Sequence, residues 1–187
     1  EQDTLRQAQT IAQAMVSLGD EPVMLPFVMD LNLTIAKLRS LNPYVVFNLV
    51  ETVAGKGNMI YFSTALLDCM RLPYTGCRTE AMFVTSNKPP TKRILHAEGV
   101  PTPAWITSEG ITTGSSPTAT YLMKPSWEDA SVGLDDDSVV MMTNPESIRA
   151  TLRKREAKIG CDCFAEAYIE GREFNIALLA ADRDVRI

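Results

Sequence analysis

The stretch YLMKPSWEDASVG at residues 121–133 decides how the rest of the chain is interpreted. Its apolar start predicts a short buried strand, which Pro125 ends directly after Lys124. The polar residues that follow, up to Ser131, predict a loop. A lysine at a strand end, facing the backbone N–H groups of such a loop, suits a polyphosphate ligand. A hairpin with a surface lysine gives the same pattern, so this stretch needs support from elsewhere in the chain.

That support comes from FAEAYIEGREFNIAL at residues 164–178. The stretch predicts a strand over 164–169 that carries one acid, Glu166, and a tight turn over 170–172. A second strand then begins at Glu173, so we expect an antiparallel hairpin. Two acids on either side of a glycine turn are common on solvent-facing strands, and this simpler interpretation stays open for the pair taken alone.

Together the two stretches resemble the D-alanine–D-alanine ligase branch of the ATP-grasp superfamily. Four further motifs of that family appear along the chain in the same order as in the family. They are FNLVE at 47–51, LPYTG at 72–76, NKPPTK at 87–92 and GVPTP at 99–103. One such motif could arise by chance, whereas the ordered set at the family's spacing is a specific signal.

The pattern of elements predicts an α/β fold. Helices over 4–18 and 34–41 alternate with strands over 22–27 and 44–49, as in an α/β unit with right-handed crossovers. The resemblance implies that residues 1–85 form an open, mostly parallel-sheet, Rossmann-like pre-ATP-grasp lobe whose first strand is missing. Residues 86–187 would form the ATP-grasp nucleotide lobe, with an antiparallel sheet and helices and without its C-terminal metal-binding part.

The resemblance also implies which residues hold the phosphates of ATP. Lys88 and Lys124 are similar to the two phosphate lysines of the family, and Ser131 lies in the loop that covers the γ-phosphate. Lys92 belongs to the same signature, but its position predicts the solvated face of a helix. Pro89 and the proline after it start that helix, since proline in the first turn loses no hydrogen bond.

The hairpin stretch supplies the residues that the resemblance assigns to adenine and ribose. Glu166 would accept a hydrogen bond from the exocyclic amine, and Glu173 would accept hydrogen bonds from the ribose hydroxyls. Ala167, Tyr168 and Ile169 would read the adenine edge with their backbone groups and wall the base with the two larger side chains.

Glu51 is the candidate from the amino-acid substrate loop. It ends the FNLVE motif, which in the family lies beside the substrates at the carboxyl ends of the strands, where open α/β sheets bind ligands. A solvated carboxylate at a strand end explains the residue equally well, and both interpretations stay open.

The resemblance implies an ATP-dependent carboxylate–amine ligase that acts through an acyl-phosphate in cell-wall precursor synthesis, with D-alanine as the expected substrate. Two positions depart from the family, because Asp129 and Ala130 stand where the phosphate loop has glycine and serine. The departures keep two alternatives open: an ATP-grasp ligase for other amino acids, and a nucleotide-binding relative without catalytic activity.

Magnesium is the second expected cofactor, in addition to ATP. The chain starts at Glu1, next to a predicted helix, and stops at Ile187 inside a predicted strand, so we expect a longer polypeptide. The Mg²⁺ ligands of the family come from a later segment, so we expect them beyond residue 187 and assign neither metal ligands nor catalytic residues here. The 187-residue chain alone is therefore predicted to be inactive.

Composition narrows the remaining function classes. The chain is 45% hydrophobic and 22% charged with a net charge of −5, and it has no basic run, which argues against nucleic-acid binding. No apolar run approaches the ~18 residues of a membrane span. The family resemblance implies a cytoplasmic protein. One histidine, His96, and four cysteines give no metal set, and reduced thiols are expected. The family resemblance adds a possible homodimer.

Overall fold

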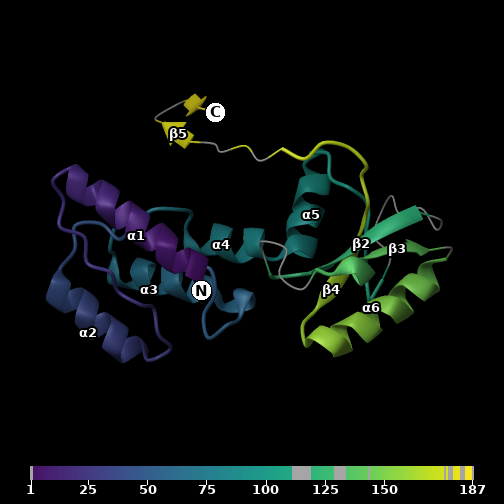
Figure 1. Ribbon diagram of the computed structural model, residues 1–187, viewed down its shortest axis with the longest axis horizontal. Coiled ribbons are helices and arrows are strands. Elements are labelled where there is room, and N and C mark those ends of the chain that lie inside the picture. The colour runs from purple at the N-terminus through teal and green to yellow at the C-terminus, as the bar shows by residue number, and fades with distance from the viewer. Residues whose placement is uncertain are drawn as a thin grey trace.

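The computed structural model describes residues 2–110, 119–128, 134–142, 144–174, 176, 179–181 and 184–186. Its elements fall into two groups at opposite ends of an elongated molecule (Figure 1). The helical lobe contains α1 (Gln2–Ser17), α2 (Leu31–Leu41) and α3 (Tyr61–Met70). The sheet lobe contains strands β1 to β4 with α5 (Lys88–Ala97) and α6 (Pro145–Ile159). Helix α4 (Thr79–Ser86) lies between the two groups (Figure 1).

The sheet lobe is built on a four-stranded antiparallel sheet, as predicted for the nucleotide lobe. Its order is β1-β4-β2-β3, with every neighbouring pair antiparallel. The strands are β1 (Trp105–Thr107), β2 (Ala119–Pro125), β3 (Val139–Met142) and β4 (Cys163–Ala167). Two short 3₁₀ turns (Gly57–Met59 and Asp136–Ser138) and a separate antiparallel pair, β5 (Leu179–Ala181) with β6 (Asp184–Arg186), complete the described elements.

The register of the sheet decides which side chains share a face. Glu166 of β4 is paired with Trp105 of β1 on one side and with Leu122 of β2 on the other. Directly paired residues point to the same face and successive residues alternate, so Glu166 and Trp105 face one side while Ala165 and Ile106 face the other.

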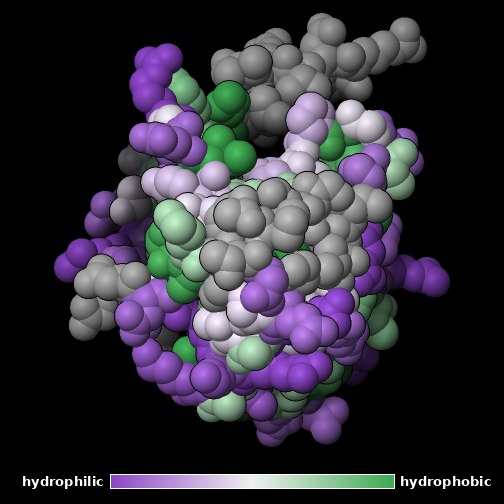
Figure 2. All heavy atoms as spheres, turned by 90° about the vertical axis from the view of Figure 1, so that its right-hand side faces the viewer, coloured by the Kyte–Doolittle hydropathy of each residue, from purple (hydrophilic) through white to green (hydrophobic). Residues whose placement is uncertain are grey.

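Helix α6 covers the face of the sheet that carries the apolar core. The fully buried members of this core come from three strands and two turns of α6: Ile106, Tyr121, Met123, Ile148, Leu152, Cys163 and Ala165. Burial raises the pKa of the Cys163 thiol to about 12, and Cys69, Cys77, Cys161 and Cys163 are all outside disulfides. Figure 2 views the molecule from the end formed by the sheet lobe. The described surface there is mostly hydrophilic, in keeping with the charged outer side of α6.

Both ends of α6 follow from its sequence. The Asn144 side chain accepts a hydrogen bond of 2.8 Å from the Ser147 N–H, and Gly160 ends the helix with a left-handed φ of 74°. One basic residue of α6, Arg155, is buried. Arg155 is 6% exposed, and its guanidinium donates to Asp135 Oδ1 at 3.0 Å and to Ser138 Oγ at 2.8 Å. Its spacing of three from Leu152 places it on the buried stripe of the helix.

The helical lobe has a core of its own. Leu38 of α2 packs with Leu66 and Leu67 of α3. Partly buried side chains from the segments around these helices complete the cluster, among them Leu25, Phe27, Val46, Leu72 and Tyr74. The predicted helices over 4–18 and 34–41 are confirmed, and Leu38 of the second one is buried, whereas Leu41 is 41% exposed.

The parallel sheet predicted for residues 1–85 is not found. From residue 2 to residue 85, β pairing is limited to two isolated pairs, a parallel one between Val46 and Tyr74 and an antiparallel one between Val53 and Lys56. The segments over 22–27 and 44–49 form no strand, although Leu25, Phe27 and Val46 pack against the core. Two residues beyond Val46, the Asn48 N–H donates to the hydroxyl of Thr75 at 3.1 Å instead of to a carbonyl. Side-chain bonds of this kind compete with a sheet ladder.

The hairpin predicted around residues 170–172 is also wrong. Strand β4 ends at Ala167, and residues 168–174 have no regular structure. After β4 the chain passes the end of α5 and runs toward β5 (Figure 1). The partner of β4 on that side is β1, a strand that the sequence analysis did not predict because it is only three residues long. Edge strands of this length carry little periodic signal.

None of the helices among the described residues combines the length and the apolar character needed to cross a bilayer.

Truncating Leu152 tests the core of the sheet lobe. Leu152 is completely buried on α6, so Leu152→Ala is expected to lower the free energy of unfolding by about 2–5 kcal/mol through lost contacts and a cavity. Arg153→Ala, on the exposed side of the same helix, is expected to change it by less than ~0.5 kcal/mol. Urea unfolding of the full-length protein followed by circular dichroism measures both. Equal effects of the two changes would contradict the assigned core.

Candidate functional site

A single carboxylate organises the face of the sheet opposite α6. Glu166 Oε1 lies 2.5 Å from Lys92 Nζ, and Glu166 Oε2 lies 2.6 Å from Lys124 Nζ. The acid is in β4, one lysine is in α5 and the other is near the end of β2. The three charged groups thus join α5 to two neighbouring strands of the sheet.

Burial makes this pairing strong. The side chains of Lys92 and Glu166 are 7% and 15% exposed, whereas that of Lys124 is 30% exposed. Burial by itself raises the pKa of Glu166, but the hydrogen bonds and positive charges of Lys124 and Lys92 outweigh it, so the pKa is lowered. The carboxylate is therefore ionised at neutral pH, and two ammonium groups leave the cluster with a positive charge.

Lys92 is the residue that the sequence analysis misplaced. It was predicted on a solvated helix face, yet it is 6% exposed, while Ile94 two residues on is 48% exposed. The buried residues of α5 are Pro89 and Lys92, and their spacing of three, which places both on one side of the helix, is the signal that could have found it. The apolar side chains of α5 alone predicted the wrong buried face, because Lys92 is buried against a carboxylate, that of Glu166.

Lys88 lies at the start of α5, beside the loop that follows β2. Its backbone N–H donates to the Ser126 carbonyl at 2.9 Å, and its Nζ donates to the Glu128 carbonyl at 2.7 Å. Ser126 is buried, and its own N–H donates to the Asp162 carbonyl at 2.8 Å. The structure therefore brings Lys88 and Lys124 to the same loop, as the phosphate interpretation requires.

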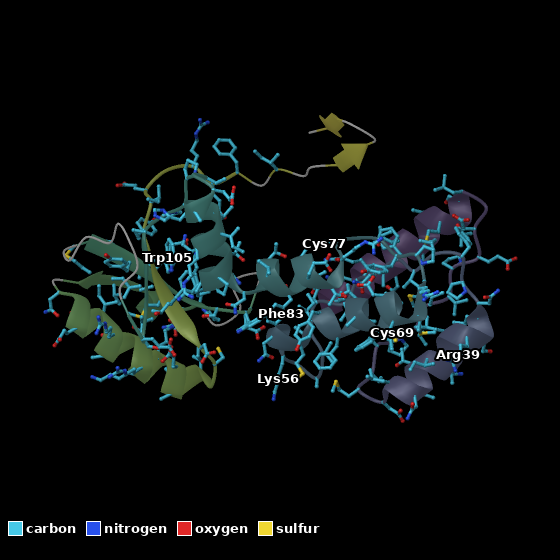
Figure 3. All side chains as sticks on the ribbon, turned by 180° about the vertical axis from the view of Figure 1, so that it is seen from behind. Arg39, Lys56, Cys69, Cys77, Phe83 and Trp105 are labelled. Atoms are coloured by element: carbon cyan, nitrogen blue, oxygen red, sulfur yellow. The ribbon has the colours of Figure 1, made fainter. Side chains whose placement is uncertain are left out.

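The same loop contacts the helical lobe. Glu128 Oε1 accepts a hydrogen bond of 3.1 Å from the Gly57 N–H. The Trp127 ring lies edge-on to Phe83 of α4, with ring centroids 5.7 Å apart. Figure 3 shows Phe83 and Lys56 where the two lobes meet, and Trp105 beside α5. A Cβ on Gly57 would lie 2.6 Å from the Trp127 carbonyl oxygen, so only glycine permits this approach.

The adenine candidates next to Glu166 are only partly available. The Ala167 N–H donates to the Ala104 carbonyl at 2.8 Å, and the Tyr168 N–H donates to the Thr120 carbonyl at 2.9 Å. A base at this edge would therefore meet carbonyl groups or the backbone of Ile169. Tyr168 and Ile169 are 50% and 68% exposed.

The remaining candidates lie away from the lysine cluster or outside the described residues. Glu173 is exposed within the irregular segment 168–174, and no described contact joins it to Glu166. Glu51 is exposed and accepts a hydrogen bond of 2.9 Å from the Thr4 hydroxyl. Ser131, Asp129 and Ala130 lie outside the described residues.

Within the part of the chain that the structure describes, no three His, Cys, Asp or Glu side chains gather where they could hold a metal ion. These residues do not fit a Mg²⁺ site, and no chemical step is assigned to a metal.

Known proteins provide an independent comparison. No family profile matches the chain. An uncharacterised protein of Sinorhizobium fredii is 27% identical over 180 residues, which cover 93% of this chain and 52% of that protein. The D-alanine–D-alanine ligase of Moorella thermoacetica is 30% identical over 191 residues, which cover 94% of this chain and 57% of the ligase. The chain spans about half the length of the curated relatives it matches.

A solved structure supports the same fold. The D-alanine–D-alanine ligase of Bacillus anthracis complexed with ATP superposes with a TM-score of 0.52 over 88% of this chain and 55% of that chain, at 15% identity. The mixed helix and strand architecture with its four-stranded antiparallel sheet therefore matches an ATP-grasp protein.

The approach at Gly57 gives a testable expectation. Gly57→Ala forces the new Cβ against the Trp127 carbonyl, so we expect a cost of about 1–3 kcal/mol and a Trp127 that is more open to water. Acrylamide quenching of tryptophan emission in the full-length protein should increase. Gly110→Ala is the matched control, because its Cβ would meet nothing within 4 Å. Unchanged quenching in the Gly57 variant would show that the two lobes do not touch there.

Neutralising Glu166 tests the electrostatic account. Glu166→Gln leaves the buried Lys92 without its charge partner, so unfolding free energy at pH 7 should fall by about 3–5 kcal/mol. Because the folded pKa of Glu166 is lowered, its contribution is complete above the unfolded pKa, ~4.3, and is lost as pH falls through the folded value. The difference between wild type and variant should therefore persist from pH 8 to 5 and shrink below about pH 4.

Urea unfolding at pH 7 and pH 3.5 measures this difference, with Glu98→Gln as the control at an exposed acid. A difference between wild type and Glu166→Gln that stays the same at both pH values would contradict an ionised Glu166.

Proposed function

Because the chain belongs to the D-alanine–D-alanine ligase family, we propose that the protein binds ATP beside Lys88, Lys124 and Glu166 and uses it to join a carboxylate to an amine. The carboxylate attacks the γ-phosphate and forms an acyl-phosphate, releasing ADP. The amine then attacks the acyl carbon, the new C–N bond forms, and inorganic phosphate leaves. By similarity to the ligases, D-alanine is the first substrate to test, and cell-wall precursor synthesis is the proposed role.

The observation that carries this proposal is the excess of positive charge around one ionised carboxylate. Lys92 and Lys124 share Glu166, and Lys88 reaches the loop that begins just after Lys124. A cluster of this charge at a strand end favours a polyanion such as a triphosphate. The site would neutralise and orient the phosphates, which is most of what a protein must do for phosphoryl transfer.

The roles of the individual residues are part of the proposal. Lys88 and Lys124 contact the phosphates, with Ser131 in the covering loop. Glu166 accepts from the exocyclic amine of adenine, and its ionised state supplies the acceptor. The segment over 167–169 lines the base and Glu173 approaches the ribose, for which residues 168–174 would have to fold over the nucleotide. Glu51 stays the substrate-side candidate.

The division of the chain and its partners are proposed on the same basis. We place the boundary near residue 85, where α4 ends, with a pre-ATP-grasp lobe before it and the nucleotide lobe after it. Separate buried clusters in the two lobes support this division. Magnesium with ATP and a homodimer are proposed from the family alone.

One feature of the sequence favours a second candidate. Asp129 and Ala130 replace a glycine and a serine of the family's phosphate loop, and the aspartate places a negative charge near the phosphates. This favours a relative that binds the nucleotide without ligase turnover, or one that acts on other amino acids.

Isothermal titration of the full-length protein with a non-hydrolysable ATP analogue tests nucleotide binding. Removing one charge-assisted contact should weaken binding by roughly 10- to 100-fold, so we expect that loss for Lys124→Met. Lys154→Met, at an exposed lysine of α6, should leave the affinity unchanged. D-alanine-dependent ADP release then separates the candidates: turnover supports the ligase, and binding without turnover for any amino acid supports the inactive relative. No binding by the wild type would overturn both.

A further inference from the structure

Lys92 occupies a position that neither phosphate binding nor packing explains. A lysine that is 6% exposed has lost almost all of its hydration, which is costly unless every part of the ammonium group is compensated. Three groups compensate the Lys92 ammonium group for this lost hydration. Lys92 Nζ lies 2.5 Å from Glu166 Oε1, 2.6 Å from Thr102 Oγ1 and 5.3 Å from the centre of the Trp105 ring.

These contacts hold Lys92 in place, whereas Lys124 has room to move. The side chain of Lys124 is 30% exposed against 7% for Lys92. When a phosphate group engages the Lys124 ammonium, Lys92 is the cation that still compensates the buried Glu166. The two lysines therefore have different tasks, although both contact the same carboxylate.

The Glu166 carboxylate can still accept a hydrogen bond from a ligand. An ionised carboxylate has about four lone-pair positions and no donor. Each oxygen of Glu166 receives one ammonium group, and 15% of its side chain remains exposed. An ionised Glu166 can thus accept from an amino group but cannot donate to a carbonyl group.

We propose that Lys92 is a positioning residue that sets the base specificity of the nucleotide site: it holds Glu166 as an oriented acceptor, so that a base with an exocyclic amine is bound in preference to one with a carbonyl at the same place. The inference rests on the proposed nucleotide site. Lys92 acts through Glu166 and does not touch the ligand.

Other groups near the pair do not take over this task. From α5, the His96 ring lies edge-on to Trp105, with ring centroids 6.2 Å apart. From β2 the charged neighbour is Lys124, and β1 contributes Trp105, which does not titrate. Without Lys92, burial acts on Glu166 with one cation fewer, which raises its pKa relative to the wild type. A protonated Glu166 can donate to a carbonyl, so the preference between bases should weaken.

The test compares ATP with inosine triphosphate, whose base carries a carbonyl in place of the exocyclic amine. Dissociation constants for both are measured by titration calorimetry at pH 7.5 and 5.5 on full-length wild type, Lys92→Met and Lys92→Arg. Lys154→Met, an exposed lysine of the same lobe, is the matched control. His96 is present in all of these proteins, so its contribution cancels in the comparison.

We expect the wild type to prefer ATP by about tenfold or more, with the same ratio at both pH values. In Lys92→Met the ratio should fall to about threefold or less and drop further at pH 5.5, mainly through lost ATP affinity. Lys92→Arg should recover most of the preference, because it keeps the cation. Thr102→Val, which removes one partner of Lys92 and keeps its shape, gives a milder loss of about threefold if Lys92→Met does not fold.

An unchanged ratio in Lys92→Met, or an equal loss of affinity for both nucleotides at both pH values, would overturn the inference and leave the nucleotide site intact. The same holds for an unchanged ratio in Thr102→Val. A wild type that binds neither nucleotide would instead refute the proposed function, and the inference with it.

Discussion

The shared carboxylate of Glu166 is the interaction on which the rest of the sheet lobe depends. It lies on the face opposite the apolar core and pairs with lysines from α5 and β2 at 2.5 and 2.6 Å. An apolar contact would hold α5 against the sheet without fixing its rotation, because such contacts have no direction. The short ion pair between Lys92 and Glu166 gives α5 a directed contact with β4, and the pair with Lys124 ties β2 to the same carboxylate.

The loop after β2 connects the sheet lobe to the helical lobe through direct contacts. Its backbone is anchored to Lys88 and Asp162, and Glu128 and Trp127 contact Gly57 and Phe83. Glu128 therefore contacts both Lys88 and the glycine turn that follows Glu51.

Sequence reasoning predicted what depends on local pattern and missed what depends on long-range pairing. The helices α1 and α2 and the strand with Lys124 at its end follow from local sequence patterns, and the antiparallel sheet follows from the family resemblance. Segments 22–27 and 44–49 have the amino-acid composition of strands. A strand also needs a neighbouring backbone to pair with, and within these two segments only Val46 has such a partner. The hairpin failed for the same reason, since β1 pairs with β4 where the second arm was expected. Lys92 was assigned to solvent because charge usually marks a surface, and its partner Glu166 explains its burial. Arg155 is buried with Asp135 as its partner in the same way.

A crystal structure of the full-length protein with a non-hydrolysable ATP analogue tests the central claim most directly. The account predicts the base within hydrogen-bond distance of the Glu166 carboxylate, the phosphates at Lys88 and Lys124, and Lys92 still paired with Glu166. A nucleotide bound elsewhere, or one that leaves the Glu166 carboxylate without a ligand contact, would contradict it.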